Sequence, residues 1–475
     1  MARLVVIGGG AAGMSAASAA RRTAPDLDVV VCEAGGFAAY GMCGIPYYLG
    51  GVVPAAEDLL AYPPSEFRDQ RGIDLRLHTW VSAIDPAAHQ VQIAGGGGVD
   101  GGGVDGAGVD GAGADGGGPL GYDALVLASG AGPVRPPVPG LDGPRVFTIR
   151  SLDEAIGLRK LLDSGTVRRA IVVGAGYVGL EAAEGLTDAG AEVEIVEALP
   201  RVLGNVDEPI ADVVQAELER HTRVRLGSRL DEVRSGSDGE LTAVVGGEEI
   251  GTDLVVVAAG VRPVTGLLIQ AGADHLPDRS LLVDKHMRTS LPDVFAAGDC
   301  VALEHLVLGR PAWIPLGPAA NKTGRVAGTV AAGGSASFGG IVGTAVVKVF
   351  GLEVARTGLT LAEAEAAGLA ARAVDVVSRS RAKYYPGAQP LHVRLVYAPD
   401  GRLLGGQLAG REGAAKRIDV LATALHAGLG VADVAGLDLS YAPPFAPVYD
   451  PVLTAAIKAS GSLASPSPST VGGSR

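Results

Sequence analysis

The sequence predicts an α/β fold in which two similar βαβ units are followed by a smaller α+β region. The segments RLVVIGGGAAGMSAASAA and RAIVVGAGYVGLEAAEGL each begin with a β-like run, turn on glycines and continue as a helix. Each leads into a second β-like run, DVVVCEA or EVEIVEA, and such segments form right-handed units with parallel strands. From about residue 341, strands such as LHVRLVY mix with helices such as GAAKRIDVLATALHAG, without another motif of this kind.

The composition is that of an acidic globular protein. The 475 residues are 47% hydrophobic, and 39 Lys and Arg against 52 Asp and Glu leave a net charge of −13. Nucleic-acid binding needs clustered basic residues, and the chain has no basic stripe. The two long uncharged stretches, 34–56 and 326–347, are interrupted by prolines or by six glycines, so no membrane span is expected.

Three cysteines are too few for a disulfide framework, and no Cys/His cluster has the spacing of metal ligands. The sequence therefore predicts no metal site and a reduced, cytoplasmic setting. Cys32 within a β-like run and Cys300 are expected to pack as small hydrophobic residues.

Each βαβ unit carries three glycines in the spacing GxGxxG and an acidic residue at the end of its second strand: Gly8, Gly10, Gly13 and Glu33, then Gly174, Gly176, Gly179 and Glu197. The first glycine makes the tight turn, the second lets a pyrophosphate approach the backbone, and the third lets helix and strand pack closely. The helix N-terminus favours phosphate, and the acidic residue accepts hydrogen bonds from ribose hydroxyls. Two such motifs predict two bound dinucleotides.

Two segments have low complexity. Residues 94–118 are mostly glycine with a recurring Asp, and we interpret them as a flexible, disordered acidic loop rather than as a calcium-binding repeat. The flanking HQVQI and YDALVLASG read as strands, which predicts a hairpin with a long tip. Residues 460–475 are rich in Ser, Pro and Gly and are predicted to be a disordered tail.

Two further segments resemble those of FAD-dependent disulfide reductases. TSLPDVFAAGDC (289–300), with Gly298 and Asp299, resembles the second flavin-binding segment, and ALVLASGAGPVRPPVPG (124–140), with Ala128 and Gly130, resembles the link between the FAD and NAD domains. The resemblance implies FAD at the N-terminal motif and NADH or NADPH at the central one, where Gly260 is a further candidate contact.

The central motif bears on the choice between the two pyridine nucleotides. Glu197 would repel a 2′-phosphate, which favours NADH, whereas Arg201 could accept that phosphate. Glu181, in GLEAAE, resembles the helix Glu that lies beside the nicotinamide and flavin in this family, although a plain helix-surface role is the alternative.

Cys43 lies alone in AAYGMCGIPYYLGG, so this loop cannot form the two-thiol centre that a CxxxxC motif provides. A single cysteine beside a flavin can form a mixed disulfide or a sulfenic acid. Pro46 favours a helix start just after Cys43, which predicts a lowered pKa for the thiol.

The segment CGIPYYLGG resembles the single-cysteine branch of the family: CoA-disulfide reductase, NADH oxidase, NADH peroxidase and persulfide reductase. The oxidase and peroxidase type carries a His where this chain has Ala11, so the resemblance favours the CoA-disulfide type. Ala39 and Met42 replace a Ser and an Asn of that type.

In the CoA-disulfide type, two tyrosines reach the cysteine of the second subunit and can protonate the departing thiolate. The matching residues are Tyr441 and Tyr384, with Tyr385 less favoured, and an aromatic packing role is the alternative. Arg22 matches a CoA-contacting Arg, and Ser15 is a further candidate for substrate binding.

The resemblance implies a homodimer with shared active sites, built from an FAD domain (1–150 and 280–340), an NAD(P)H domain (151–279) and a C-terminal dimerisation domain (341–459). The expected activity is electron transfer from NAD(P)H through FAD and Cys43 to a small disulfide, foremost CoA disulfide or a CoA persulfide. The alternatives are an NADH oxidase that reduces O2 through a Cys43 sulfenate, and a redox sensor or electron-transfer protein.

Overall fold

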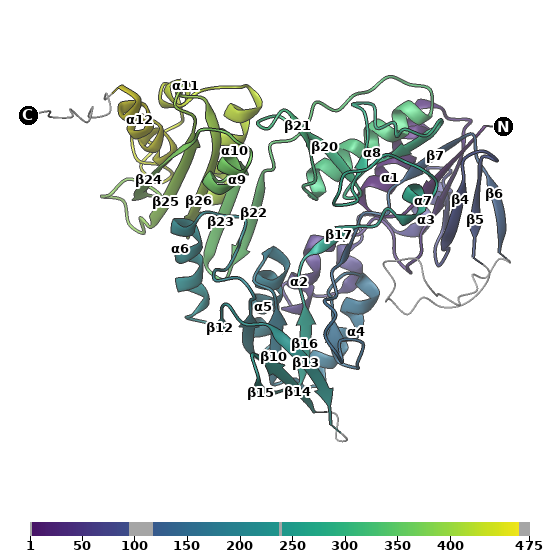
Figure 1. The fold of residues 1–475 in the computed structure, drawn as a ribbon, viewed down its shortest axis with the longest axis horizontal. Helices are drawn as coiled ribbons and strands as arrows, with labels where there is room; N and C mark the ends of the chain where they lie inside the picture. Colours follow the sequence, from purple (N-terminus) through teal and green to yellow (C-terminus); the bar gives the residue numbers. More distant parts are fainter. Residues whose placement is uncertain (1, 95–116, 237–239, 465–475) are drawn as a thin grey trace, which may run out of the picture. The chain divides into compact units, whose positions relative to one another are not determined.

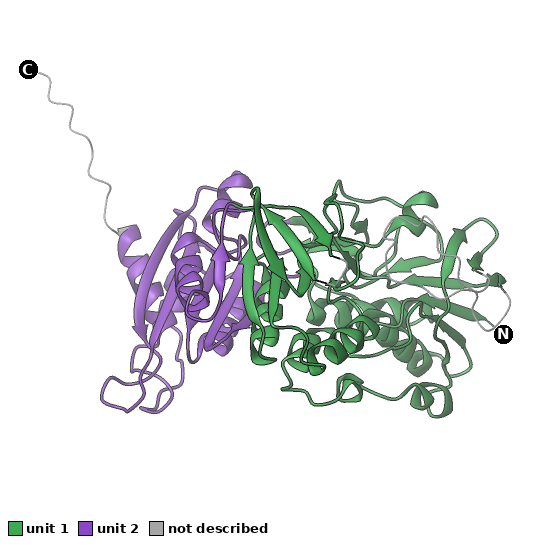
Figure 2. Ribbon diagram, turned by 90° about the horizontal axis from the view of Figure 1, so that it is seen from below, with its two compact units in different colours: residues 1–198, 228–304, 310–340 green, residues 199–227, 305–309, 341–475 purple. Residues whose placement is uncertain are grey.

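The computed structural model describes residues 2–94, 117–236 and 240–464. The chain forms two compact units (Figure 2): unit 1 comprises residues 1–198, 228–304 and 310–340, and unit 2 comprises residues 199–227, 305–309 and 341–475. Both predicted dinucleotide-binding regions fall in unit 1, except that residues 199–227 and 305–309 group with the C-terminal region. The boundary between the two dinucleotide-binding domains stays a prediction.

The first βαβ unit builds the N-terminal parallel sheet of unit 1 (Figure 1). β1 (Arg3–Ile7) leads through α1 (Ala11–Thr23) to β2 (Asp28–Cys32), and β1 and β2 pair in parallel. The sheet order is β19-β7-β1-β2-β3, and its other strands are β3 (Asp74–Arg76), β7 (Ala124–Leu127) and β19 (Val294–Ala296). β1 and β2 are buried after their first residues, as in sheets covered on both faces.

Helices α1 and α8 (Gly317–Ala331) pack with their backbones in close contact. A Cβ atom on Gly324 would lie 2.1 Å from the Ala12 oxygen, and one on Gly328 would lie 2.0 Å from the Ala16 oxygen. Only glycine fits at these two positions, so the small residues of α8 hold it directly against α1.

The second βαβ unit repeats this arrangement. β10 (Arg169–Val173) leads through α5 (Tyr177–Asp188) to β11 (Glu192–Val196), and the two strands pair in parallel. On its other side β10 pairs with β16 (Leu254–Val257), which pairs with β9 (Val146–Phe147).

Short elements complete unit 1. The helical ones are 3-10 turns η1 (Met42–Gly44) and η2 (Ala56–Leu59), and helices α2 (Ile45–Leu49), α3 (Pro64–Asp69), α4 (Leu152–Asp163) and α7 (Gly266–Gln270). The strands are β4 (Val81–Asp85), β5 (Gln90–Ile93), β6 (Gly118–Gly121), β8 (Ala131–Pro133), β13 (Leu230–Ser235), β14 (Leu241–Val245), β15 (Glu248–Thr252), β17 (Val261–Pro263), β18 (Leu281–Leu282), β20 (Val301–His305) and β21 (Arg310–Ala312).

The hairpin around the glycine-rich segment differs from the prediction. β5 pairs with β6, from Gln90↔Gly121 to Ile93↔Gly118, whereas the expected partner strand in YDALVLASG is β7 and pairs with β1 instead. The reason is that β6 forms from GPLG, a stretch too poor in β-branched residues to read as a strand. The predicted disorder of the loop falls on residues 95–116, which lie outside the described residues.

Unit 2 is an antiparallel sheet, β22-β23-β26-β25-β24, packed with helices. The strands of this sheet are β22 (Ala345–Val349), β23 (Leu352–Gly358), β24 (Arg372–Arg379), β25 (Pro390–Tyr397) and β26 (Leu403–Gly410). Unit 2 also contains the short strand β12 (Arg223–Arg225) and helices α6 (Glu208–Leu218), α9 (Leu361–Ala366), α10 (Ala414–His426), α11 (Val431–Ala435) and α12 (Pro451–Ala464). A buried ion pair joins Arg394 to Asp207 at 2.8 Å, and Gln407 donates to the same carboxylate. α12 continues to Ala464, so residues 460–464 of the predicted disordered tail are helical.

None of the helices among the described residues has the length and apolar character that crossing a bilayer requires.

Candidate active site

The first glycine turn leaves room where a phosphate group is expected. Gly8 has φ +105°, and a Cβ atom there would lie 2.4 Å from the Ala128 oxygen. A Cβ atom on Gly13 would lie 1.8 Å from the Gly8 oxygen, whereas one on Gly10 would meet nothing within 4 Å. The first and third glycines are therefore required by packing within the protein, and the second faces open space.

The second glycine turn has the same construction. Gly174 has φ +106° and would place a Cβ atom 2.4 Å from the Ala258 oxygen, and a Cβ atom on Gly179 would lie 2.0 Å from the Gly174 oxygen. Gly176, like Gly10, faces open space. Both turns thus offer a bare backbone at the start of a helix, which fits the pyrophosphate of a dinucleotide.

The two acidic residues lie across their turns. The backbone N–H of Gly9 donates to Glu33 Oε2 at 2.6 Å, and that of Ala175 donates to Glu197 Oε2 at 2.7 Å. Each carboxylate is therefore held at the turn where a ribose would lie. The sequence did not predict its hydrogen bond with the backbone of the turn. Its contact with ribose stays a prediction.

The Gly298–Asp299 segment lies beside the first turn. Gly298 has φ +85°, a Cβ atom there would lie 2.7 Å from the Ala12 side chain, and its N–H donates to Thr323 Oγ1 at 3.1 Å. Burial raises the pKa of the Asp299 carboxyl, and the Arg150 guanidinium lowers it by a smaller amount. The tertiary structure thus brings Asp299 to the N-terminal end of α1.

The two linking strands are joined through two predicted glycines. β8 pairs with β17, Val134 N–H donates to the Gly260 oxygen at 2.9 Å, and Val264 N–H donates to the Gly130 oxygen at 3.0 Å. Gly130 and Gly260 both have positive φ, +69° and +107°. Their conformation explains why these positions are glycine, and nothing in it tests a cofactor contact.

Cys43 lies in η1, immediately before α2, and its side chain is exposed, whereas Cys32 and Cys300 are buried as expected. The predicted low pKa of its thiol is wrong. Partial desolvation by the surrounding protein raises the pKa, and the Glu181 and Asp299 carboxylates raise it further. α2 has only five residues, Ile45–Leu49, so its dipole is too small to offset two nearby carboxylates.

Arg150 is a neighbour of this loop that the sequence did not reveal. Its Nη1 donates to the Met42 sulfur at 2.7 Å, and its charge lowers the pKa values of Asp299 and Tyr40 against the larger effect of burial. No motif marks this position, and only the fold brings it beside Met42.

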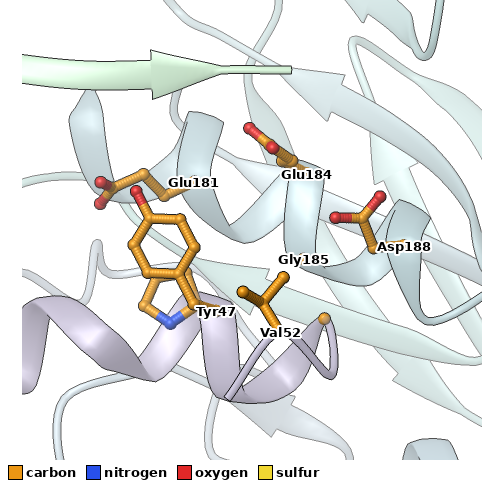
Figure 3. A pocket seen from close by; sticks show the side chains of 8 residues that line it. Tyr47, Val52, Glu181, Glu184, Gly185 and Asp188 are labelled. Carbon is orange, nitrogen blue, oxygen red and sulfur yellow. The ribbon is translucent and has the colours of Figure 1, made fainter. Parts of the chain in front are cut away.

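Helices α2 and α5 enclose a small pocket (Figure 3). Tyr47 and Val52 line one side, and Glu181, Glu184 and Asp188 line the other. Burial raises the pKa of the Glu181 carboxyl to about 7. Glu181 thus lines a pocket, and its expected place beside the nicotinamide and flavin stays a prediction.

The substrate candidates on α1 lie seven residues apart and so share one face of the helix. Ser15 donates to Asn321 Oδ1 on α8 at 2.8 Å, and Arg22 is exposed near the end of α1. Arg201, in unit 2, forms an ion pair with Glu208 at 3.0 Å.

In unit 2 the two predicted tyrosines meet. Their hydroxyl oxygens are 3.3 Å apart, and Tyr384 and Tyr441 are 75% and 45% exposed. Tyr385 is turned to Arg381, whose guanidinium lies 5.7 Å from its ring centre. The structure thus brings together the favoured pair.

Comparison with known proteins identifies the family. Residues 2–327 match the family described as pyridine nucleotide-disulphide oxidoreductase, and residues 344–451 match its dimerisation domain. The chain belongs to this family. FAD is the family's cofactor, and the chain is an NAD(P)H-dependent oxidoreductase.

The chain is 36% identical over 456 residues to an NAD(P)H sulfur oxidoreductase (CoA-dependent) of Pyrococcus furiosus, covering 96% of this chain and 98% of the relative. It is 32% identical to an NADH oxidase of Methanocaldococcus jannaschii (96% and 98% covered) and 27% identical to a coenzyme A disulfide reductase of Staphylococcus haemolyticus (94% and 96% covered). The structure of an NAD-dependent persulfide reductase from A. fulgidus superposes with a TM-score of 0.89 at 37% identity, covering 97% of this chain and 83% of that one. These relatives confirm the predicted fold and family.

Proposed function

We propose that this enzyme reduces CoA disulfide or a CoA persulfide with NAD(P)H, and that Cys43 is its redox-active sulfur. The observation that carries the proposal is the placement of the one exposed cysteine. The cysteine loop is bonded to the first glycine turn, through Ala39 N–H to the Gly9 oxygen at 2.8 Å, and α2 packs on the helix that follows the second turn. A sulfur at this place can be served by both nucleotide sites.

Each nucleotide has a defined set of residues. Gly8, Gly10, Gly13, Glu33, Gly298 and Asp299 would hold FAD, with Ala128 and Gly130 nearby, and Gly174, Gly176, Gly179, Glu197 and Gly260 would hold NAD(P)H. The bound flavin supplies two-electron transfer between the nicotinamide and sulfur. Ser15 and Arg22 would contact the CoA moiety.

The chemistry at Cys43 is thiol–disulfide exchange followed by reduction. The Cys43 thiolate attacks R–S–S–R, forms Cys43–S–S–R and releases R–S−. Two electrons from NAD(P)H then cleave this mixed disulfide into the Cys43 thiolate and a second R–S−. The sum is NAD(P)H + H+ + R–S–S–R giving NAD(P)+ and two R–SH.

The family's dimerisation domain supports a dimer and a small disulfide substrate. We propose that Tyr384 and Tyr441 of one subunit face Cys43 of the other and donate a proton to the departing thiolate. Their adjacent, exposed hydroxyls support this role, because a phenol can donate to a forming thiolate.

An NADH oxidase is the second candidate, favoured by the Methanocaldococcus jannaschii relative. Ala11 speaks against it, because it leaves the first turn without the His of the oxidase type. A redox sensor is a third, distinct class and would turn over slowly with every small disulfide.

Mass spectrometry of Cys43 in the isolated protein, with anaerobic turnover on CoA disulfide, tests the proposal. We expect a CoA adduct on Cys43 and rapid anaerobic NAD(P)H oxidation. A sulfenic acid with fast oxygen uptake and no disulfide turnover would show an oxidase instead.

A further inference from the structure

Cys43 needs a proton when its disulfide is reduced, and the protein around it adds negative charge. Reduction of Cys43–S–S–R releases two thiolates into a region that already holds Glu181 and Asp299. Burial and both carboxylates raise the pKa of the Cys43 thiol, which favours the protonated form of the reduced sulfur. Tyr384 and Tyr441 are proposed to serve the departing thiolate, which leaves the Cys43 sulfur without a donor.

The pocket between α2 and α5 provides one. Cys43 lies in η1 and Tyr47 in α2, four residues later, and the charge of Cys43 raises the pKa of the Tyr47 hydroxyl. Figure 3 shows the Tyr47 hydroxyl beside the Glu181 carboxyl, and the negative charge of Glu181 raises the pKa of Tyr47 as well, second to desolvation. The Cys43 thiol, the Tyr47 phenol and the Glu181 carboxyl thus interact electrostatically with one another.

Glycines fix this arrangement. A Cβ atom on Gly185 would lie 2.5 Å from the Pro46 oxygen, and one on Gly50 would lie 3.2 Å from the Gly185 Cα atom. α2 is therefore held directly against α5, with Tyr47 opposite Glu181. This close packing leaves little freedom for the two side chains to separate.

The Glu181 carboxyl is suited to hold a proton. Within the described residues it has no hydrogen-bond partner, and the other charged groups that line its pocket are the acidic Glu184 and Asp188. In the part of the chain that the structure describes, no Lys, Arg or His lines that pocket. Burial alone raises the pKa of Glu181 to about 7, so the group both gives and takes a proton near neutral pH.

We propose that Glu181 and Tyr47 form a proton relay that protonates the Cys43 sulfur within the same chain. The step is Cys43–S–S–R + 2 e− + Glu181–COOH giving Cys43–SH, R–S− and Glu181–COO−, with the electrons from NAD(P)H. The proton passes from Glu181 through the Tyr47 hydroxyl to the Cys43 sulfur as the S–S bond breaks, so the release of R–S− depends on it. Solvent returns a proton to Glu181. The relay rests on the proposed disulfide reduction and adds its proton path.

The test uses the holoenzyme with a preformed Cys43 mixed disulfide and follows release of R–S− after anaerobic mixing with NAD(P)H. We expect Glu181→Gln to slow release roughly ten-fold or more, the lower part of the range for a lost acid. In the wild type, release should slow as the pH rises through about 7, because Glu181 loses its proton there, and Glu181→Gln should lack this limb. Tyr47→Phe should reduce the rate while keeping the ring packed.

A second experiment, alkylation of Cys43, measures the effect of the Glu181 charge on the thiol without enzymatic turnover. Glu181→Gln removes a negative charge near Cys43, so its thiol pKa should fall and iodoacetamide should alkylate it faster at pH 8. Asp188→Asn is the matched control, since Asp188 lies on the same helix face but is exposed. It should change neither alkylation nor thiol release.

Three outcomes would overturn the relay: unchanged release and pH profile in Glu181→Gln, unchanged alkylation, or equal slowing of flavin reduction by NAD(P)H. The last would assign Glu181 to nicotinamide positioning. Failure of the wild type itself to release R–S− would overturn the disulfide reductase proposal, which is a distinguishable result.

Discussion

The two glycine turns of unit 1 are nearly identical in backbone and differ in what their helices carry. Gly8 and Gly174 have φ values of +105° and +106°. A Cβ atom on the third glycine of either turn would lie about 2 Å from a backbone oxygen. Two residues after that third glycine, however, α1 carries Ser15 and α5 carries Glu181. Ser15 bonds Asn321, whereas Glu181 faces Tyr47 and influences Cys43.

This difference separates binding from chemistry. The shared backbone explains why both turns can accept a pyrophosphate, and it says nothing about the reaction. In the proposed function the reaction takes place at the cysteine loop, which is bonded to the first turn and packed through α2 on α5. A duplicated binding motif therefore acquires one reactive site from a segment that is not duplicated.

We expect the largest effects from substitutions that disrupt each glycine turn separately. Gly13→Ala would place a Cβ atom 1.8 Å from the Gly8 oxygen, so we expect nearly complete loss of bound flavin, measured by its absorbance relative to protein. Gly179→Ala, at 2.0 Å from the Gly174 oxygen, should keep FAD and raise the KM for NAD(P)H roughly ten-fold or more, since overpacking costs about 1–3 kcal/mol. Loss of flavin in both variants would show that the turns are not independent.

The second prediction tests whether only one site carries a redox sulfur. Cys43→Ser should abolish disulfide reduction but keep FAD and its reduction by NAD(P)H, because neither needs the thiol. Anaerobic titration should show two fewer electrons taken up per chain than in the wild type. Equal electron uptake would rule out Cys43, and Cys300→Ser is a control at a buried cysteine.

The third prediction asks whether the second subunit completes the cysteine site. Tyr441→Phe keeps the ring and removes the donor, so we expect kcat with CoA disulfide to fall roughly ten-fold. In the double variant with Tyr384→Phe, kcat should fall by less than the product of the two single effects. The reason is that the two hydroxyls are 3.3 Å apart and are proposed to serve one leaving group. Full turnover in both single variants would contradict the assignment.

The fourth prediction compares the two acidic residues. Glu197→Ala should raise kcat/KM for NADPH relative to NADH by roughly five-fold, the equivalent of about 1 kcal/mol of like-charge repulsion near water. Glu33→Ala should weaken FAD binding and leave this preference unchanged. A preference that shifts equally in both variants would contradict the assignment of the two sites.

The smallest effect concerns the segment that connects β5 and β6. β5 and β6 already pair up to Ile93↔Gly118, so a short turn can replace residues 95–117. Flavin content and turnover should stay within about two-fold of the wild type. Loss of FAD would show that the segment contacts the cofactor.

The sequence alone predicted the parts of this protein that depend on local spacing. Glycines at fixed offsets after a β-like run produced the same turn twice, because the close approaches at Gly13 and Gly179 involve backbone only a few residues away. The buried Cys32 and helix α10 of the C-terminal region were likewise predictable from their own residues.

Only the tertiary structure decided the electrostatics of the site. Glu181, Asp299 and Arg150 come from distant parts of the chain, and their effects on Cys43 and Met42 depend on packing that no local pattern records. The expected low pKa of the Cys43 thiol failed for this reason. A local rule considered the start of one short helix, whereas a pKa depends on every charge and every desolvating atom that the fold brings near the sulfur.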